Sequence, residues 1–165
     1  MNRLRFLMML LAAIFTLAVP TLVPAQGGPA AVREQLQQAI SRGDVAGALA
    51  LFADDAVIDQ MSGTGVCVAA PCVGKVAIQK DMERRVTAKN QPKTLNHYVS
   101  GNVLTTRVAV ESDVIRKAGA ERAILWLVYE VKDGKIVSEL GPLWERTDPQ
   151  TARFLEWLRA QQPAR

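Results

Sequence analysis

The sequence predicts an α+β fold in which helices pack on one side of a curved antiparallel sheet. From Val32 to Val86, most apolar residues recur at the three- to four-residue spacing of amphipathic helices. From Thr94 onward the chain is instead rich in β-branched and aromatic residues, as strands are. Asp133-Gly134 separates two of these later stretches and is typical of a tight hairpin turn.

The N-terminal segment is expected to be an export signal. A basic start precedes an almost wholly apolar run over residues 6–19, which is shorter than the about 20 residues of a membrane-spanning helix. Small residues favour cleavage after Ala25, so we expect residues 1–25 to be a signal peptide and residues 26–165 to form a secreted or periplasmic protein with no stable membrane span. The alternative is an uncleaved N-terminal anchor.

Charge argues against nucleic-acid binding. The full chain has a formal net charge of +4, of which Arg3 and Arg5 of the expected signal carry two charges, leaving +2. No basic run is longer than Arg84-Arg85, and no basic stripe is interleaved with aromatic residues. No repeat or linker divides residues 26–165, so we expect one domain.

Two helices are expected first, joined at Gly43-Asp44. Glycine is a common helix terminator, and aspartate is a favoured N-terminal cap. The apolar face of the first helix comprises Val32, Leu36, Ala39 and Ile40. That of the second comprises Val45, Ala48, Leu49 and Phe52. A short strand over residues 56–58 should follow, and Gly74 should lead into a third helix. The buried side of this third helix comprises Ile78, Met82 and Val86.

Cys67 and Cys72 lie in the loop between the short strand and the third helix. In an oxidising compartment such a pair most plausibly forms a disulfide, which would stabilise the fold by about 2 kcal/mol. The alternatives are a redox pair or a metal site. Cys-x-x-Cys spacing is absent, and His97 is the only further Cys or His side chain, so no metal site is expected.

The second half should form four long strands and a final helix. The expected strands are residues 95–99, 107–116, 123–131 and 135–144. Asp148-Pro149 should open the last helix, with the aspartate as its cap and the proline in its first turn. Its expected inward residues are Phe154, Leu155 and Leu158.

The run Leu51-Phe52-Ala53-Asp54-Asp55-Ala56, preceded by Gly43-Asp44 and followed by Gly74-Lys75, resembles the SnoaL-like branch of the nuclear transport factor 2 superfamily. The resemblance covers residues 26–165 almost entirely. It implies a cone-shaped, cystatin-like roll around a mostly apolar pocket, and a homodimer formed through the sheet. The superfamily includes isomerases, polyketide cyclases, dehydratases, epoxide hydrolases and proteins that only bind or assemble, so the fold does not choose the activity.

Two catalytic patterns known on this fold do not transfer. Ketosteroid isomerases use a carboxylate base with a Tyr and a protonated Asp, and the resemblance puts these roles at Gln60, Leu36 and near Leu127. The epoxide hydrolases need an Arg and two Asp in a close relay. Arg107 and Asp113 are too widely spaced to match that relay.

His97 is the candidate general base or acid, because histidine titrates nearest neutral pH. Asp59 or Asp113 could assist it. Asp59 adjoins Gln60 but should face the other side of its strand unless a bulge intervenes. Asp113 and Glu111 should share a strand face. The alternatives are a structural or surface His97 and a half-solvated acidic strand face.

Large aromatic residues could wall a site for a flat hydrophobic ligand. The candidates are Tyr98, Trp126, Tyr129 and Trp144. They could equally be core or dimer contacts. Glu130 and Glu139 interrupt apolar strands and could face the pocket or mark a sheet edge.

The expected function is therefore that of an exported SnoaL-like protein that encloses a small hydrophobic molecule. If the protein is an enzyme, we expect an isomerase, cyclase or hydrolase that acts by proton transfer without a cofactor. The alternative is a ligand-binding or dimeric assembly module without chemistry.

Overall fold

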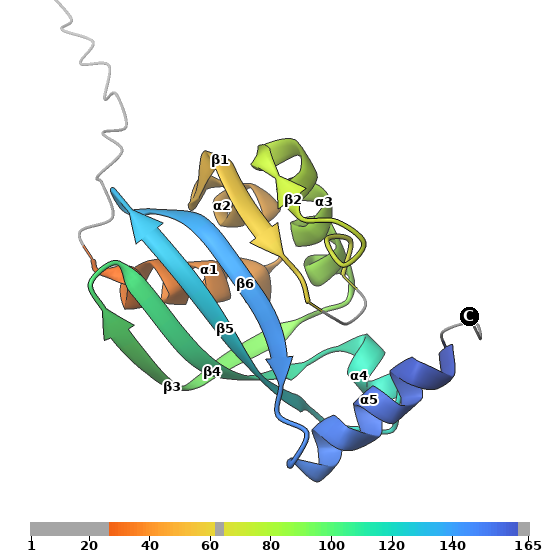
Figure 1. Cartoon of the computed structure of the whole chain (residues 1–165). Coiled ribbons are helices and arrows are strands. Elements are labelled where there is room, and N and C mark those ends of the chain that lie inside the picture. Colours follow the sequence, from red (N-terminus) through yellow and green to blue (C-terminus); the bar gives the residue numbers. More distant parts are fainter. Residues whose placement is uncertain (1–26, 62–64, 162–165) are drawn as a thin grey trace, which may run out of the picture.

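The computed structural model describes residues 27–61 and 65–161 (Figure 1). The expected signal peptide, residues 1–25, lies outside this part of the chain. The elements are α1 (Pro29–Arg42), α2 (Val45–Ala50), β1 (Phe52–Asp59), β2 (Cys72–Val73), α3 (Gly74–Thr87), β3 (Gln91–Ser100), β4 (Val103–Glu111), α4 (Asp113–Lys117), β5 (Ala123–Lys132), β6 (Lys135–Trp144) and α5 (Pro149–Gln161).

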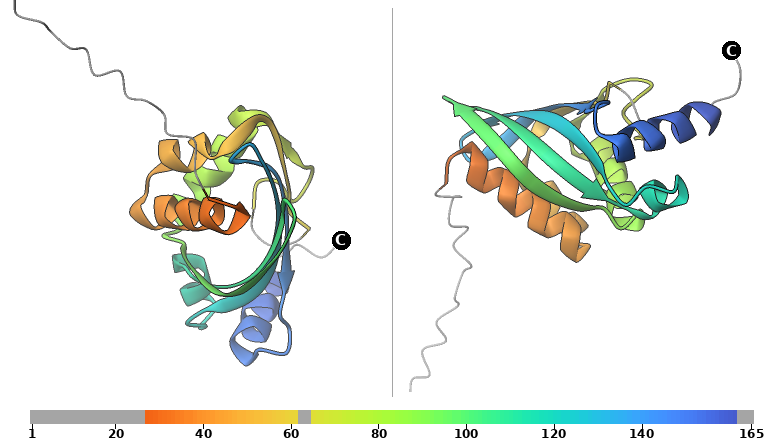
Figure 2. Two further views of the ribbon diagram at one scale, coloured as in Figure 1. Left: turned by 90° about the vertical axis from the view of Figure 1, so that its left-hand side faces the viewer. Right: turned by 90° about the horizontal axis from the view of Figure 1, so that it is seen from below.

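The strands form one six-stranded sheet in the order β2-β1-β6-β5-β4-β3. All neighbours pair antiparallel except β1 and β6, which are parallel. The sheet curves, and α1, α2 and α3 cover its concave side (Figure 2). The α+β prediction is confirmed. In the described ranges, no helix combines the length and the hydropathy that crossing a membrane requires.

The expected helix boundaries between α1 and α2 are confirmed. Gly43 ends α1 with a φ of 75°, in the left-handed region that glycine tolerates best. Asp44 caps α2, since its Oδ1 accepts a hydrogen bond of 2.7 Å from the Gly47 amide. Phe52, which we expected on the helix, is instead the fully buried first residue of β1. It pairs with Ile136 of β6, so sheet pairing overrides the helical spacing here.

The predicted strand 107–116 is wrong at both ends. The strand β4 begins at Val103 and stops at Glu111, and the chain then enters the short helix α4. Ser112 causes this change, because its Oγ accepts a hydrogen bond of 3.2 Å from the Ile115 amide and so caps α4. Consequently Glu111 and Asp113 do not share a strand face.

Two local predictions in the rest of the chain are confirmed. Cys67 and Cys72 form a disulfide. The hairpin between β5 and β6 turns at Asp133-Gly134, where φ is positive at both residues, 49° and 72°.

The final helix closes the end of the roll beside α4 (Figure 1). The carboxylate of Asp148 accepts a hydrogen bond of 2.9 Å from the Thr151 amide, as expected of a cap. Phe154 packs edge-on against Trp144 at 5.3 Å between ring centroids. These contacts form a second hydrophobic cluster beside the main core, and both clusters border the pocket described next.

Candidate functional site

A pocket lies between the concave face of the sheet and the helices. The volume within which the centre of a water-sized molecule can lie is about 110 Å³. A single water needs about 10–15 Å³ on this measure, so the pocket has room for a small organic molecule. Its apolar lining comprises Ile40, Pro92, Val108, Val110, Val114, Ile115, Leu125, Leu127, Pro142, Trp144 and Phe154. Its polar lining includes Arg33, Gln60, Arg84, Arg85, Asn90, Ser112, Tyr129 and Glu139.

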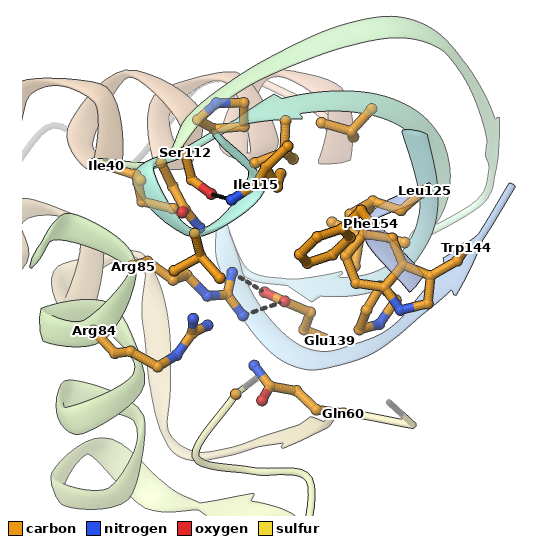
Figure 3. Close-up of a pocket in the computed structure, with 18 of the residues that line it drawn as sticks. Ile40, Gln60, Arg84, Arg85, Ser112, Ile115, Leu125, Glu139, Trp144 and Phe154 are labelled. Atoms are coloured by element: carbon orange, nitrogen blue, oxygen red, sulfur yellow. Dashed lines mark hydrogen bonds and ion pairs between the residues drawn. The ribbon is translucent and has the colours of Figure 1, made fainter. Parts of the chain in front are cut away.

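The pocket has a polar end and an apolar end. Arg84, Arg85, Gln60 and Glu139 gather at one end, whereas Phe154, Trp144 and Leu125 lie at the other (Figure 3). A molecule bound here would thus meet different chemistry at its two ends.

Glu139 is the carboxylate that lines the pocket. It lies on β6 directly opposite Tyr129 of β5, so the two side chains point to the same concave face. The exposed fractions of Glu139 and Tyr129 are only 2% and 1%. A carboxylate so deeply buried requires a partner charge.

Arg85 of α3 supplies that charge and joins two carboxylates. Its Nη2 and Nη1 donate hydrogen bonds to the two carboxylate oxygens of Glu139, at 2.6 and 3.3 Å (Figure 3). Its Nε donates to Oδ2 of Asp81, one helical turn earlier, at 2.6 Å. The guanidinium therefore bridges helix α3 and strand β6 behind the pocket wall.

Asp81 and Gln60 extend this network to the disulfide loop. Asp81 is fully buried and also accepts hydrogen bonds from Arg84 and from the side-chain amide of Gln60, the latter at 3.0 Å. The Gln60 side-chain oxygen accepts a hydrogen bond from the Cys67 amide at 3.2 Å. Each of these buried groups is hydrogen-bonded, which is the condition for a buried polar network to hold one geometry.

The local charges shift three pKa values. Burial alone would raise the pKa of Asp81, but the positive charges of Arg85 and Arg84 outweigh it and lower that pKa. Burial alone would lower the pKa of Arg85, yet the Asp81 and Glu139 charges raise it. Burial raises the pKa of the Tyr129 hydroxyl. Asp81 therefore stays ionised at neutral pH, while Arg85 and Tyr129 stay protonated.

This arrangement can support proton transfer at Glu139. A carboxylate has about four lone-pair positions, and Arg85 occupies one on each oxygen. The remaining positions can accept a proton or a hydrogen bond from a molecule in the pocket. Tyr129 is a protonated donor opposite. No three of the His, Cys, Asp and Glu residues in the described ranges are grouped so that they could hold a metal ion.

The three predicted catalytic residues lie elsewhere. His97 is exposed on β3, an edge strand, where Thr94 and Asn96 flank a register shift. Asp59 is exposed at the end of β1. Asp113 begins α4 and forms ion pairs with Arg116 and Lys89 at 2.7 and 3.5 Å. The structure does not bring these residues together, and their catalytic roles stay predictions.

The four aromatic candidates divide between the two faces of the sheet. Tyr129 and Trp144 line the pocket. Tyr98 and Trp126 stack on the convex face, with ring centroids 6.4 Å apart.

The positions matched to the ketosteroid isomerase pattern fall around this pocket. Gln60 and Leu127 line it, and Leu36 is fully buried in the core. The side chains at those positions supply none of that pattern's acids or bases. Glu139 faces the pocket, whereas Glu130 lies on the convex face, where it accepts a hydrogen bond from Asn102.

Sequence reasoning missed Arg33, Asp81 and Arg85. The spacing of these residues along their helices could have identified them. Asp81 and Arg85 follow Ile78 by three and seven residues, which places both on the buried side of α3. Arg33 likewise shares the buried side of α1 with Leu36. Charged residues at such positions indicate buried, paired or functional groups.

Comparison with known proteins identifies the domain family and agrees with the fold. A family model described as a SnoaL-like domain matches residues 32–139. No curated protein sequence is significantly similar to the chain.

Several solved structures share the fold. The epoxide hydrolase/cyclase-like enzyme SalBIII, which has a role in pyran ring formation in salinomycin, matches with a TM-score of 0.59 and 19% identity, over 73% of this chain and 92% of that one. An NTF2-like protein from Cytophaga hutchinsonii matches with a TM-score of 0.57 and 12% identity, over 74% of this chain and 94% of that one. A Mycobacterium tuberculosis protein in complex with estradiol-17beta-hemisuccinate matches with a TM-score of 0.56 and 21% identity, over 70% of this chain and 93% of that one.

Proposed function

Because the chain belongs to the SnoaL-like domain family, we propose that it encloses a small hydrophobic molecule in this pocket and transfers a proton on it. The observation that carries the proposal is Glu139, a buried carboxylate held by Arg85 at the polar end of an otherwise apolar pocket. Similar folds are found in an epoxide hydrolase/cyclase-like enzyme and in a protein that binds a steroid derivative, which supports both halves of the proposal.

In the proposed step, Glu139 removes a proton from the bound molecule and later returns it to another atom. Arg85 orients the Glu139 carboxylate before the step through hydrogen bonds to both of its oxygens. The Tyr129 hydroxyl, whose pKa burial raises, donates a hydrogen bond to the oxygen on which negative charge develops. The proton passes between Glu139 and the bound molecule, so the step requires no cofactor.

Proton exchange tests this proposal without knowledge of the natural substrate. Cyclohexanone, acetophenone and phenylacetone would be incubated with the protein in deuterium oxide, and loss of the protons beside the carbonyl followed by NMR. We expect Glu139→Gln to slow enzyme-dependent exchange by about a hundredfold or more. Glu130→Gln, on the convex face, is the matched control and should exchange at the wild-type rate. Equal exchange by wild type and Glu139→Gln would contradict the proposal.

The second candidate function is binding without chemistry. It is favoured by Gln60 and Leu127, which line the pocket at or near the positions where the resemblance puts the base and an oxyanion donor of the ketosteroid isomerases. Saturable binding of these ketones with no exchange in any variant would establish the carrier function instead.

We propose further that the protein is an exported homodimer. The disulfide supports export, since such bonds persist in oxidising compartments. Mass spectrometry of the exported protein should find Gln26 at its N-terminus, and retention of residues 1–25 would favour the anchor. The exposed apolar convex face supports the dimer, with Tyr98 62% and Leu143 47% exposed.

A further inference from the structure

Arg33 of α1 lines the pocket and is only 4% exposed. Within the described ranges, its Nε and Nη1 have no hydrogen-bond partner. Its guanidinium carbon lies 5.5 Å from the centroid of the Tyr129 ring, and Arg33 also hydrogen-bonds the Tyr129 side chain, but neither contact satisfies Nε or Nη1. Buried guanidinium groups are normally paired with acceptors, so this one requires an explanation.

The other charges at the pocket do not neutralise Arg33. Glu139 is bound through both oxygens by Arg85, and Asp81 is shared by Arg85 and Arg84. The three arginines carry three positive charges against two carboxylates, which leaves a net charge of +1 at the polar end. The charges of these described residues therefore leave the polar end positive.

We infer that Arg33 is a carboxylate-binding residue and that the molecule taken up by the pocket is a small apolar carboxylic acid. An oxygen of the carboxylate would accept a hydrogen bond from one of the unsatisfied donors, Nε or Nη1. Because the rest of the lining is largely apolar, the remainder of the molecule would extend along Leu125 and Leu127 toward Phe154. The inference rests on the proposed function, in that it names the class of molecule that the same pocket encloses.

The position of Arg33 also fits the proposed proton transfer. The Arg33 guanidinium lies over the Tyr129 ring, and Tyr129 lies opposite Glu139 across the β5–β6 pair. A carboxylate held by Arg33 would therefore place the neighbouring atoms of the same molecule at the polar end, beside Glu139.

Matched acids and amides test the inference. The full chain would be expressed, and the purified protein titrated by calorimetry with phenylacetate, cyclohexylacetate and octanoate, each compared with its primary amide. We expect wild type to bind at least one acid about tenfold or more tightly than its amide, because hydrogen bonds to a charged partner are the stronger ones. Arg33→Met should remove this preference while amide affinity is kept, and Arg33→Lys should restore part of it. Arg42→Met, at the exposed end of the same helix, is the control and should keep it.

Binding of the amides distinguishes a failure of this inference from a failure of the proposed function. If wild type binds acids and amides equally, the inference is overturned while the proposed hydrophobic pocket survives. If neither acids nor amides bind, the inference falls together with the proposed function. If Arg33→Met keeps the preference for acids, Arg33 is not the binding residue and the inference is overturned.

Discussion

Among single residues, the polar end of the pocket depends on buried charges that are tolerated only while each is paired with an opposite charge. Asp81, Arg85 and Glu139 are each less than a tenth exposed. Replacing a whole buried ion pair by apolar groups is often neutral, but removing one member leaves an unpaired buried charge and costs about 3–5 kcal/mol. The network is therefore poor evidence of high stability, and its retention is better explained by the site it forms.

Acid should weaken the fold through Asp81. Its folded-state pKa is below the ordinary 3.8, so its stabilising contribution is complete above the unfolded pKa and is lost as pH falls through the folded one. We expect Asp81→Asn to lower the free energy of unfolding by about 3 kcal/mol at pH 7. This deficit should shrink as the pH falls below about 4, where wild type also becomes protonated. Urea denaturation across this pH range measures both values.

Asp113 provides the control for that prediction. The hydrogen bond from Arg116 lowers the pKa of Asp113 as well, but this side chain is exposed and screened by solvent. Asp113→Asn should therefore change stability little at any pH. Similar losses for Asp81→Asn and Asp113→Asn would show that burial of the network has no energetic consequence.

At the element scale, α1 ends where the backbone demands glycine. Gly43→Ala should lower the free energy of unfolding by about 1 kcal/mol, because an alanine side chain disfavours the left-handed conformation at a φ of 75°. Steric overlap adds little, since the added carbon would meet Val86 at an ordinary 3.7 Å. Gly43→Asn, which adds a side chain that tolerates the left-handed region better than alanine does, is the control and should lose less stability. Equal stability of both variants in urea denaturation would refute this explanation.

Much of the element order was predictable, because caps and turns are local. Gly43, Asp44 and Asp133-Gly134 each determine the backbone around them. The predicted element boundaries fail where pairing with a distant segment, or a helix too short to show a period, determines the structure. Phe52 continues the helical spacing of α2 but pairs with β6, and Ser112 caps a five-residue helix too short to show a period.

The candidate site was less predictable than the fold. His97 was singled out by its chemistry, but the register shift next to it and the edge position of β3 depend on partner strands. The charged pocket residues were visible only as interruptions of apolar faces. Their pairing joins residues 54 positions apart in the chain, as Arg85 and Glu139 are, and no local pattern encodes it.

At the scale of the whole molecule, the convex face of the sheet should form the proposed dimer. Tyr98→Glu places a charge on the exposed ring that stacks with Trp126, so we expect dissociation to monomers in analytical ultracentrifugation. Val76→Glu makes the same change at an apolar residue that is 79% exposed on α3, and should leave the dimer intact. A Tyr98→Glu protein that sediments as wild type would exclude this face as the interface.

We propose that a small hydrophobic molecule binds in the concave pocket. Two tryptophans report on the two faces of the sheet, since Trp144 lines the pocket and Trp126 lies on the convex face. Their indole N–H signals can be assigned with Trp144→Phe and Trp126→Phe variants. The decisive measurement is an NMR titration of the wild-type protein with acetophenone. We predict a saturable shift of the Trp144 signal with Trp126 unchanged, and a shift of Trp126 alone, or of neither signal, would contradict the claim.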